Sequence, residues 1–179
     1  YKKLIWAADY TSLYRLSSIE QLKKINQRNR LLAYRKTLDT MKSAESVFTI
    51  YALTDLSHSF FDERSSEHFF YTPNKGGLSQ APLIKADSME AFIPFLGPHL
   101  YYNTYEISIP ALRDHRLAPK GKSALIISIL MDYDIIDHIK TSGYLDACKT
   151  YMTKYILNLL STSIYPDLKA HVEETFCST

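Results

Sequence analysis

Glycine is scarce in this chain, with five glycines among 179 residues. A share of roughly 7% is usual in globular proteins. Nucleotide-binding domains need glycine where the backbone approaches a pyrophosphate, and neither G-x-G-x-x-G nor G-x-x-x-x-G-K-[ST] occurs here. The stretches Lys75–Gly77 and Lys120–Lys122 resemble parts of phosphate loops, but their surroundings are typical of turns. We therefore do not expect this chain to bind a dinucleotide by these devices.

Cysteine and long apolar runs are also lacking. The two cysteines, Cys148 and Cys177, are far apart and show no CxxC spacing, which argues against a disulfide scaffold or a zinc site. This usage favours a reducing compartment, although a single disulfide between the two stays open. No apolar run approaches the roughly 18–20 residues that a membrane span needs, and the first residues have no signal-peptide layout. The sequence is typical of a globular cytoplasmic protein.

Positive charge is in clear excess at the start of the chain. The net charge is +2 overall, but residues 1–42 hold ten Lys or Arg against three Asp or Glu. A solvated helix face is the favoured explanation. An alternative is peripheral contact of Lys23–Lys42 with an anionic membrane. Nucleic acid is not expected as a partner, because the overall charge is close to neutral.

Catalytic and metal-binding patterns are equally few. The six histidines never occur at H-x-H or H-E-x-x-H spacing, so no metal site is expected. Asp132 and Asp134 could offer two carboxylates, but their place between a strand and a helix favours helix capping, with Asp134 as the cap. No G-x-S-x-G is present, and neither cysteine has a catalytic signature. The sequence identifies no catalytic residue.

Periodicity indicates an α+β fold: a mixed, largely antiparallel sheet with helices packed on one side. Strands and helices mix without strict βαβ alternation. Gly97 and Pro98 are expected to end one helix, before an alternating aromatic strand. Strands are predicted at 1–8, 43–54, 68–72, 99–109, 123–131 and 171–179, and helices at 11–16, 18–25, 26–40, 86–96, 134–140 and 144–163.

Aromatic residues, in contrast, are plentiful, with fourteen Tyr and eight Phe. Several lie in the predicted strands, where one face must fill a core and the other could line a cleft for an apolar, elongated or planar ligand. Ordinary core packing is the competing explanation for each of them. From strand position alone, the candidate pocket residues are Phe48, Tyr51, Phe70, Tyr102 and Tyr105.

Several segments of the sequence, taken in order, resemble a known protein family. They are Met41–Tyr51, His68–Pro73, Tyr105–Asp114, Leu117–Lys122 and Leu130–Tyr133. In this order they resemble the middle of the phytoene desaturase and retinol saturase family of FAD-dependent oxidoreductases. The resemblance covers nearly the whole chain, and it rests on structural phrases rather than on catalytic signatures.

The resemblance implies a substrate-binding domain over 1–179 of a larger flavoprotein, with 1–9 as the end of a strand of the flavin domain. In this family an N-terminal Rossmann segment and a C-terminal segment together hold FAD. Those flanking segments would be missing here, so FAD is expected in the full-length parent and no cofactor-binding residue in this piece. The parent would act on carbon–carbon bonds of a polyene, isoprenoid or lipid-like substrate, while the piece alone would be inactive.

Two further expectations accompany this interpretation. Apolar surface that the flavin domain would otherwise cover should favour self-association. The abrupt, strand-like ends of the sequence agree with an excised piece. The alternative hypothesis is a stand-alone module that binds an apolar ligand or a protein partner and has no enzymatic activity.

Overall fold

The computed structural model describes residues 3–41, 45–82 and 88–179. They belong to two compact units, Tyr1–Ser43 and Ala44–Thr179, where the sequence suggested one domain. The hydrophobic core explains the division, because its cluster of buried side chains contains no residue before Ala44. Within the described part of the first unit, Leu38 alone is a buried hydrophobic residue. Each unit is therefore described by itself.

The N-terminal unit is a pair of helices, α1 (Tyr10–Leu16) and α2 (Ile25–Thr40). The Asp9 carboxylate caps α1 by accepting a 2.7 Å hydrogen bond from the Ser12 amide. The Arg35 guanidinium ties α2 to α1 by donating to the Tyr14 carbonyl at 2.7 Å. Hydrogen bonds of side chains to the backbone thus hold this unit together more than apolar burial does.

Two predictions for this unit are wrong. Residues 3–9 do not form a strand, because the described part of the unit offers no other strand with which they could pair. The helix predicted over 18–25 is a turn region, and helical structure resumes only at Ile25. Ile25, the last residue of the helix predicted over 18–25, is 69% exposed.

The second unit is built on a five-stranded sheet in which every pair is antiparallel. The strand order is β2-β3-β4-β1-β5, so the two longest strands lie side by side near the middle. The strands are β1 (Glu45–Thr54), β2 (His68–Tyr71), β3 (Tyr105–Ser108), β4 (Ser123–Asp132) and β5 (Val172–Ser178).

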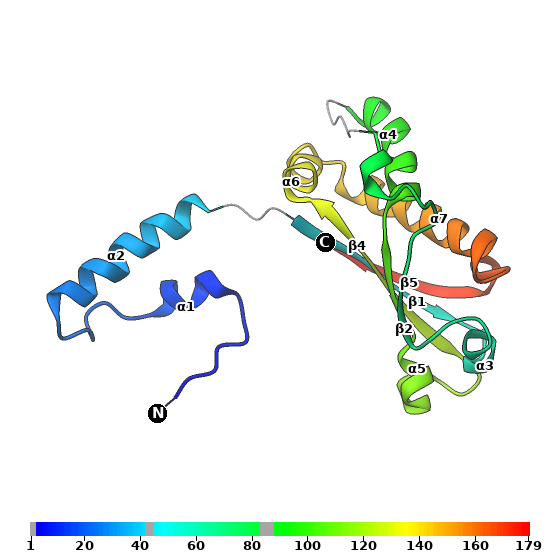
Figure 1. Ribbon diagram of the computed structural model, residues 1–179, viewed down its shortest axis with the longest axis horizontal. Helices are drawn as coiled ribbons and strands as arrows, with labels where there is room; N and C mark the ends of the chain where they lie inside the picture. Colours follow the sequence, from blue (N-terminus) through cyan, green and yellow to red (C-terminus); the bar gives the residue numbers. More distant parts are fainter. Residues whose placement is uncertain (1–2, 42–44, 83–87) are drawn as a thin grey trace. The chain divides into compact units, whose positions relative to one another are not determined.

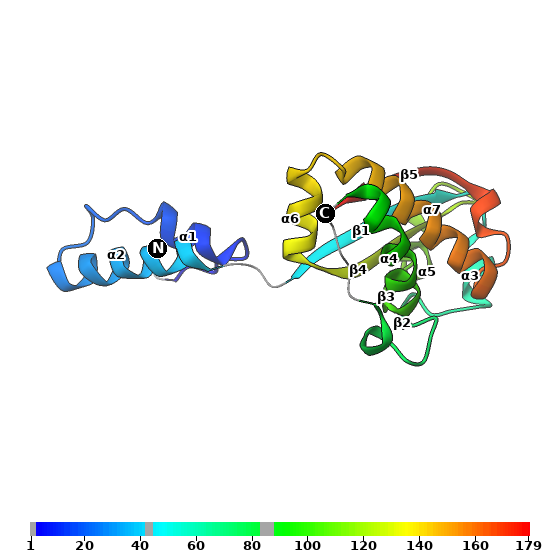
Figure 2. The same cartoon turned by 90° about the horizontal axis from the view of Figure 1, so that it is seen from above.

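Three helices cover one face of this sheet, as Figures 1 and 2 show. They are α4 (Met89–Tyr102), α6 (Tyr133–Thr141) and α7 (Leu145–Ser163), and each contributes to the hydrophobic core. Two short helices, α3 (His58–Asp62) and α5 (Pro110–Arg113), complete the α-helices of the described unit. The predicted α+β class, with helices on one side of a largely antiparallel sheet, is confirmed.

Alternation along the strands explains this one-sided packing. In β1, Phe48, Ile50 and Ala52 are at most 1% exposed, whereas Val47 and Tyr51 are more than 40% exposed. Successive side chains of a strand point to opposite faces, so the first three meet the helices and the others do not. Most predicted strands and helices of this unit agree with the structure to within a few residues.

Helix α4 is the main departure in this unit. The sequence predicted its end at Gly97 and a strand from His99, but the helix continues through Pro98 to Tyr102. Phe92, Leu96 and Leu100 recur at helical spacing and are fully buried. Their burial, at about 1.5–3 kcal/mol each, is of the same size as the roughly 3 kcal/mol that each of the two internal prolines, Pro94 and Pro98, costs.

Gly97 has a packing role where a helix end was expected. A Cβ at this position would lie 3.1 Å from the Tyr151 hydroxyl oxygen and 3.5 Å from a Tyr155 ring carbon, both on α7. The missing side chain therefore allows α4 to approach α7 closely. Asn103 then ends the helix, and its amide donates to the Leu130 carbonyl of β4 at 3.1 Å.

We expect Phe48→Ala to lower the free energy of unfolding of the sheet unit by about 3–5 kcal/mol, because it removes a fully buried ring and leaves a cavity. The adjacent Val47→Ala is the matched control. Val47 lies on the other face and is 47% exposed, so its truncation should cost less than about 1 kcal/mol. Urea unfolding followed by circular dichroism measures both. Equal losses for the two variants would contradict this assignment of the faces.

Candidate functional site

The face of the sheet opposite α4, α6 and α7 is open and rich in apolar side chains. Its exposed members come from four strands, and strand register places them on the same side. A monomeric protein rarely exposes a large contiguous apolar patch unless something binds there. The exposed fractions are 47% for Val47, 43% for Tyr51, 66% for Phe70, 48% for Leu130 and 66% for Phe176.

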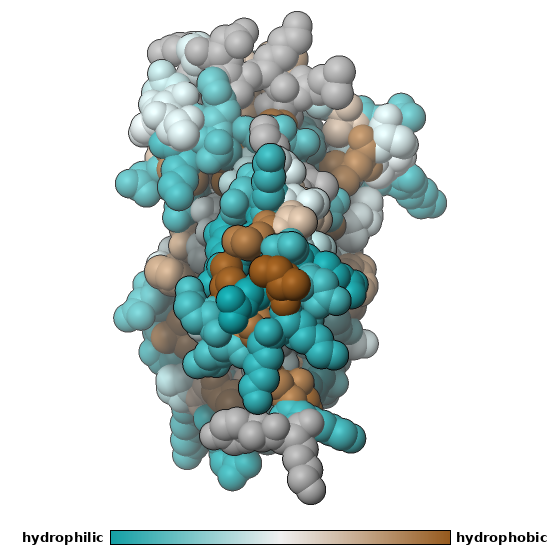
Figure 3. Space-filling view, turned by 90° about the vertical axis from the view of Figure 1, so that its left-hand side faces the viewer, coloured by the Kyte–Doolittle hydropathy of each residue, from teal (hydrophilic) through white to brown (hydrophobic). Residues whose placement is uncertain are grey.

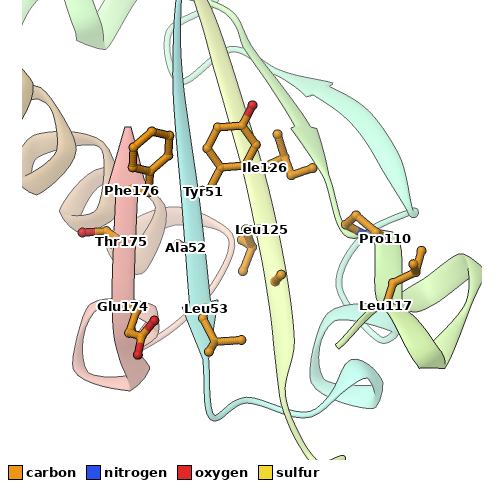
Figure 4. A pocket seen from close by; sticks show the side chains of 11 residues that line it. Tyr51, Ala52, Leu53, Pro110, Leu117, Leu125, Ile126, Glu174, Thr175 and Phe176 are labelled. Carbon is orange, nitrogen blue, oxygen red and sulfur yellow. The ribbon is translucent and has the colours of Figure 1, made fainter. Parts of the chain in front are cut away.

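The larger hollow on this face has a volume of about 580 Å³. Figure 4 shows the rings of Tyr51 and Phe176 side by side on β1 and β5, with Ile126 next to them on β4. The two ring centroids are 5.9 Å apart. Pro110 and Leu117 border the other side. We call this hollow the Tyr51 hollow.

A second hollow of about 360 Å³ lies toward the other end of β1. Val47 and Leu130, a directly opposed pair of β1 and β4, contribute to it together with Phe70 of β2. Leu78, in a short 3-10 turn at Leu78–Gln80, adds a further apolar side chain. We call this the Val47 hollow.

A row of polar side chains crosses the face between Tyr51 and Val47, and two of its members, Glu106 and Ser128, also line the Val47 hollow. Register places Glu106 of β3, Ser128 of β4, Thr49 of β1 and Ser178 of β5 directly beside one another. The Thr49 and Ser128 hydroxyl oxygens are 3.1 Å apart and share a hydrogen bond. The Glu106 carboxylate lies 2.9 Å from the Nε2 atom of His68. We call these four residues the polar row.

The five aromatic residues predicted as a pocket do not form one. Tyr51 and Phe70 reach the open face, but they belong to different hollows. Phe48 and Tyr105 are at most 1% exposed and lie in the core under the helices. Tyr102 is half-buried on α4, where a strand was expected.

Tyr105 in particular is a structural residue. Its hydroxyl donates a 2.6 Å hydrogen bond to the Leu100 carbonyl near the end of α4. Burial raises the pKa of this phenol far above its usual range, so Tyr105 stays protonated and holds the helix against the sheet. It is not available as an acid or base.

Several residues of the face were missed by reasoning on aromatic residues alone. Ile126, Leu130, Val47 and Leu117 line the hollows but are aliphatic, and Phe176 was not among the candidates. The sequence feature that could have identified these residues is the run Ser123–Met131. It is apolar at almost every position, and strands of this kind are normally covered on both faces.

The histidines and carboxylates of the described residues form pairs rather than metal-binding clusters. Groups of three or more His, Cys, Asp or Glu that could hold a metal are absent from the described ranges. His171 pairs with Asp55 at 2.7 Å, and the rings of His58 and His115 lie 4.2 Å apart with their planes tilted by 39°. The prediction for the Asp132–Asp134 stretch needs a correction, because Asp132 caps α6 through the Ile135 amide at 3.1 Å.

The basic N-terminal unit has a hollow of its own, of about 350 Å³, lined by Tyr14, Arg30, Leu31 and Tyr34. Arg28 donates to the Leu22 carbonyl at 2.6 Å, so part of the positive charge serves the local fold. Apolar residues of α2 are spread around the helix and form no single stripe. In the view of Figure 3 most of the surface is hydrophilic, with small apolar groups between. Within the described residues, no helix has both the length and the apolar character that crossing a membrane requires.

No protein-family model matches the chain, and no curated protein matches it. The family resemblance therefore rests only on the sequence segments quoted above.

The two cysteines differ in their environment, although both remain thiols. Cys148 of α7 is 2% exposed, and burial raises its pKa to about 11. An activated nucleophile would require a pKa shifted in the opposite direction. Cys177 of β5 is only partly buried.

We therefore expect Cys177 to react with Ellman's reagent at pH 8 much faster than Cys148, because the thiolate is the attacking species and Cys148 is both protonated and inaccessible. Absorbance at 412 nm should show one fast thiol per chain, and Cys177→Ser should remove the fast phase. Cys148→Ser is the control and should leave it intact. A fast phase that persists in Cys177→Ser would refute the assignment.

Proposed function

We propose that the sheet unit is the substrate-binding domain of an FAD-dependent oxidoreductase similar to the phytoene desaturase and retinol saturase family. The substrate would be a polyene, isoprenoid or lipid-like molecule, altered at its carbon–carbon bonds. The observation that carries the proposal is the open apolar face with its two hollows. A sheet whose helices cover one face only is suited to form one wall of a site that another part of the protein completes.

The dimensions of the face suit an elongated ligand. Val47 and Leu53 are six residues apart on β1 and line the two different hollows. At about 3.3 Å per residue, this places the hollows within a strip roughly 20 Å long. A chain of a dozen or more carbon atoms has a comparable length. Shape and polarity together favour an extended apolar molecule over a compact polar one.

This chain's own residues do not fit the role of holding FAD. Within the described residues, no glycine-rich turn precedes a helix in the way that a pyrophosphate site requires. Gly77, Gly121 and Gly143 have positive φ, and a Cβ added at any of them would meet no atom within 4 Å, so none marks a close approach of the backbone to another part of the fold. In the proposal the flavin supplies the redox chemistry and is bound by the flanking segments of the full-length protein. The residues of the open face bind the substrate, orient it and exclude water.

A second candidate function uses the same face without a flavin. The apolar hollows also favour a stand-alone module that binds an apolar ligand or a protein partner, including a second copy of the chain. In either case the protein would be cytoplasmic, and its basic N-terminal unit would allow peripheral contact with an anionic membrane. The two candidates differ in their dependence on FAD, which is measured directly.

The full-length protein should show flavin absorption bands near 375 and 450 nm after purification, whereas residues 1–179 alone should show none above 320 nm. Denaturation of the full-length protein should release FAD, identified by chromatography against a standard. A folded, colourless full-length protein that also fails to take up added FAD would overturn the flavoenzyme proposal and leave the binding module.

Tyr51→Ser should weaken binding of diphenylhexatriene, an apolar fluorescent polyene, by roughly tenfold in the full-length protein. The ring is an apolar wall of the Tyr51 hollow, and loss of such a contact costs about 1.5 kcal/mol. Tyr101→Ser is the matched control, because this tyrosine is similarly exposed, at 39%, but belongs to α4. Its effect should stay within twofold. Fluorescence titration measures both, and equal losses would place the ligand elsewhere.

A further inference from the structure

The polar row is the least expected feature of the open face. It crosses the sheet at the edge of the Val47 hollow, which Glu106 and Ser128 also line, and the Tyr51 hollow lies on its other side. Along β1 the order is Val47, Thr49 and Tyr51, so the polar position lies between two apolar ones on the same face. A ligand that occupies both hollows must pass over this row.

Glu106 is the decisive member of the row. One oxygen of its carboxylate, Oε1, contacts His68 at 2.9 Å, and within the described residues Oε2 accepts no hydrogen bond. Open to water, Oε2 is solvated. Beneath a bound ligand it would lose water, and a carboxylate oxygen deprived of water is costly unless a donor replaces that water.

The chemistry of that donor follows from the neighbours. A ligand carboxylate would be repelled by Glu106, a pure hydrocarbon would leave Oε2 without a donor, and a ketone has no proton to donate. An ammonium group would donate to Glu106 but could accept nothing from a neighbouring hydroxyl. A hydroxyl satisfies both sides, because it donates to Glu106 and can accept from the Ser128 or Thr49 hydroxyl. These two hydroxyls share one hydrogen bond between them, so one proton remains to be donated.

We propose that the ligand of the open face carries a hydroxyl group part-way along an apolar chain, and that Glu106 accepts a hydrogen bond from it. This inference rests on the proposed function, since it names the class of molecule that the same face takes. The position of the hydroxyl follows from the hollows, which lie on both sides of the polar row. Apolar chain therefore extends from the hydroxyl in two directions. Glu106 acts as a specificity-determining residue.

The test uses the full-length protein loaded with diphenylhexatriene. Dodecane, 1-dodecanol and 6-dodecanol, delivered from cyclodextrin, compete for the site, and the loss of fluorescence gives their relative affinities. These three molecules share one chain length and differ in the presence and place of the hydroxyl. We expect 6-dodecanol to bind roughly tenfold more tightly than dodecane, the size of one hydrogen bond to a charged acceptor, and several-fold more tightly than 1-dodecanol.

Glu106→Leu should abolish this preference, so that the three competitors bind within about twofold of one another. Glu45→Leu is the matched control, because Glu45 lies on the same face of β1 but lines neither hollow and is outside the polar row. It should retain the tenfold preference. If Glu106→Leu fails to fold by circular dichroism, Glu106→Gln replaces it, and its weaker neutral acceptor should reduce the preference to about threefold.

The outcomes separate this inference from the function on which it rests. If diphenylhexatriene does not bind, the open face is no apolar ligand site and both fail. If the probe binds but dodecane competes as well as 6-dodecanol, only the hydroxyl is refuted. If 1-dodecanol binds best, the internal position is wrong, and if Glu45→Leu rather than Glu106→Leu removes the preference, the assignment to Glu106 is wrong.

Discussion

The antiparallel pairing of β1 with β4 is the constraint on which the sheet unit depends. Its register runs without interruption from Glu45 opposite Asp132 to Thr54 opposite Ser123. This pairing places Phe48, Ile50, Leu125 and Ile127 under the helices. The same pairing places the alternate side chains of β1 and β4 on the open face. A shift by one residue would exchange the two sets, so the core and the candidate site are fixed by the same hydrogen bonds.

Much of this architecture could be predicted because the strands and helices of the sheet unit carry strong local signals. The alternation of β1 and the apolar positions of α7 each specify one element without help from distant parts of the chain. Helix α4 could not be predicted in the same way. Proline and glycine are local signals for a helix end, whereas the burial of Leu100 and the close approach of Gly97 to α7 exist only in the folded unit.

The candidate site was harder to predict for a related reason. Aromatic residue type does not indicate which face of a strand a side chain occupies, and Phe48 and Tyr51 prove to lie on opposite faces of one strand. The alternation of odd and even positions along β1 would have assigned these two residues to opposite faces of the sheet. The polar row could not be predicted from the sequence. Glu106, Ser128 and Thr49 become neighbours only through the registers of β3 with β4 and of β4 with β1.

The polar row also bears on whether two copies of the open apolar face would pair with each other. A charged side chain amid apolar neighbours opposes face-to-face pairing of two sheets, since such pairing would bury the charge. This role and ligand recognition make different demands on Glu106. Any charge of either sign would oppose pairing, whereas recognition of a hydroxyl requires an acceptor at this position. The His68 contact suits recognition, because the 2.9 Å hydrogen bond with Nε2 fixes the carboxylate in one orientation, which repulsion alone does not require.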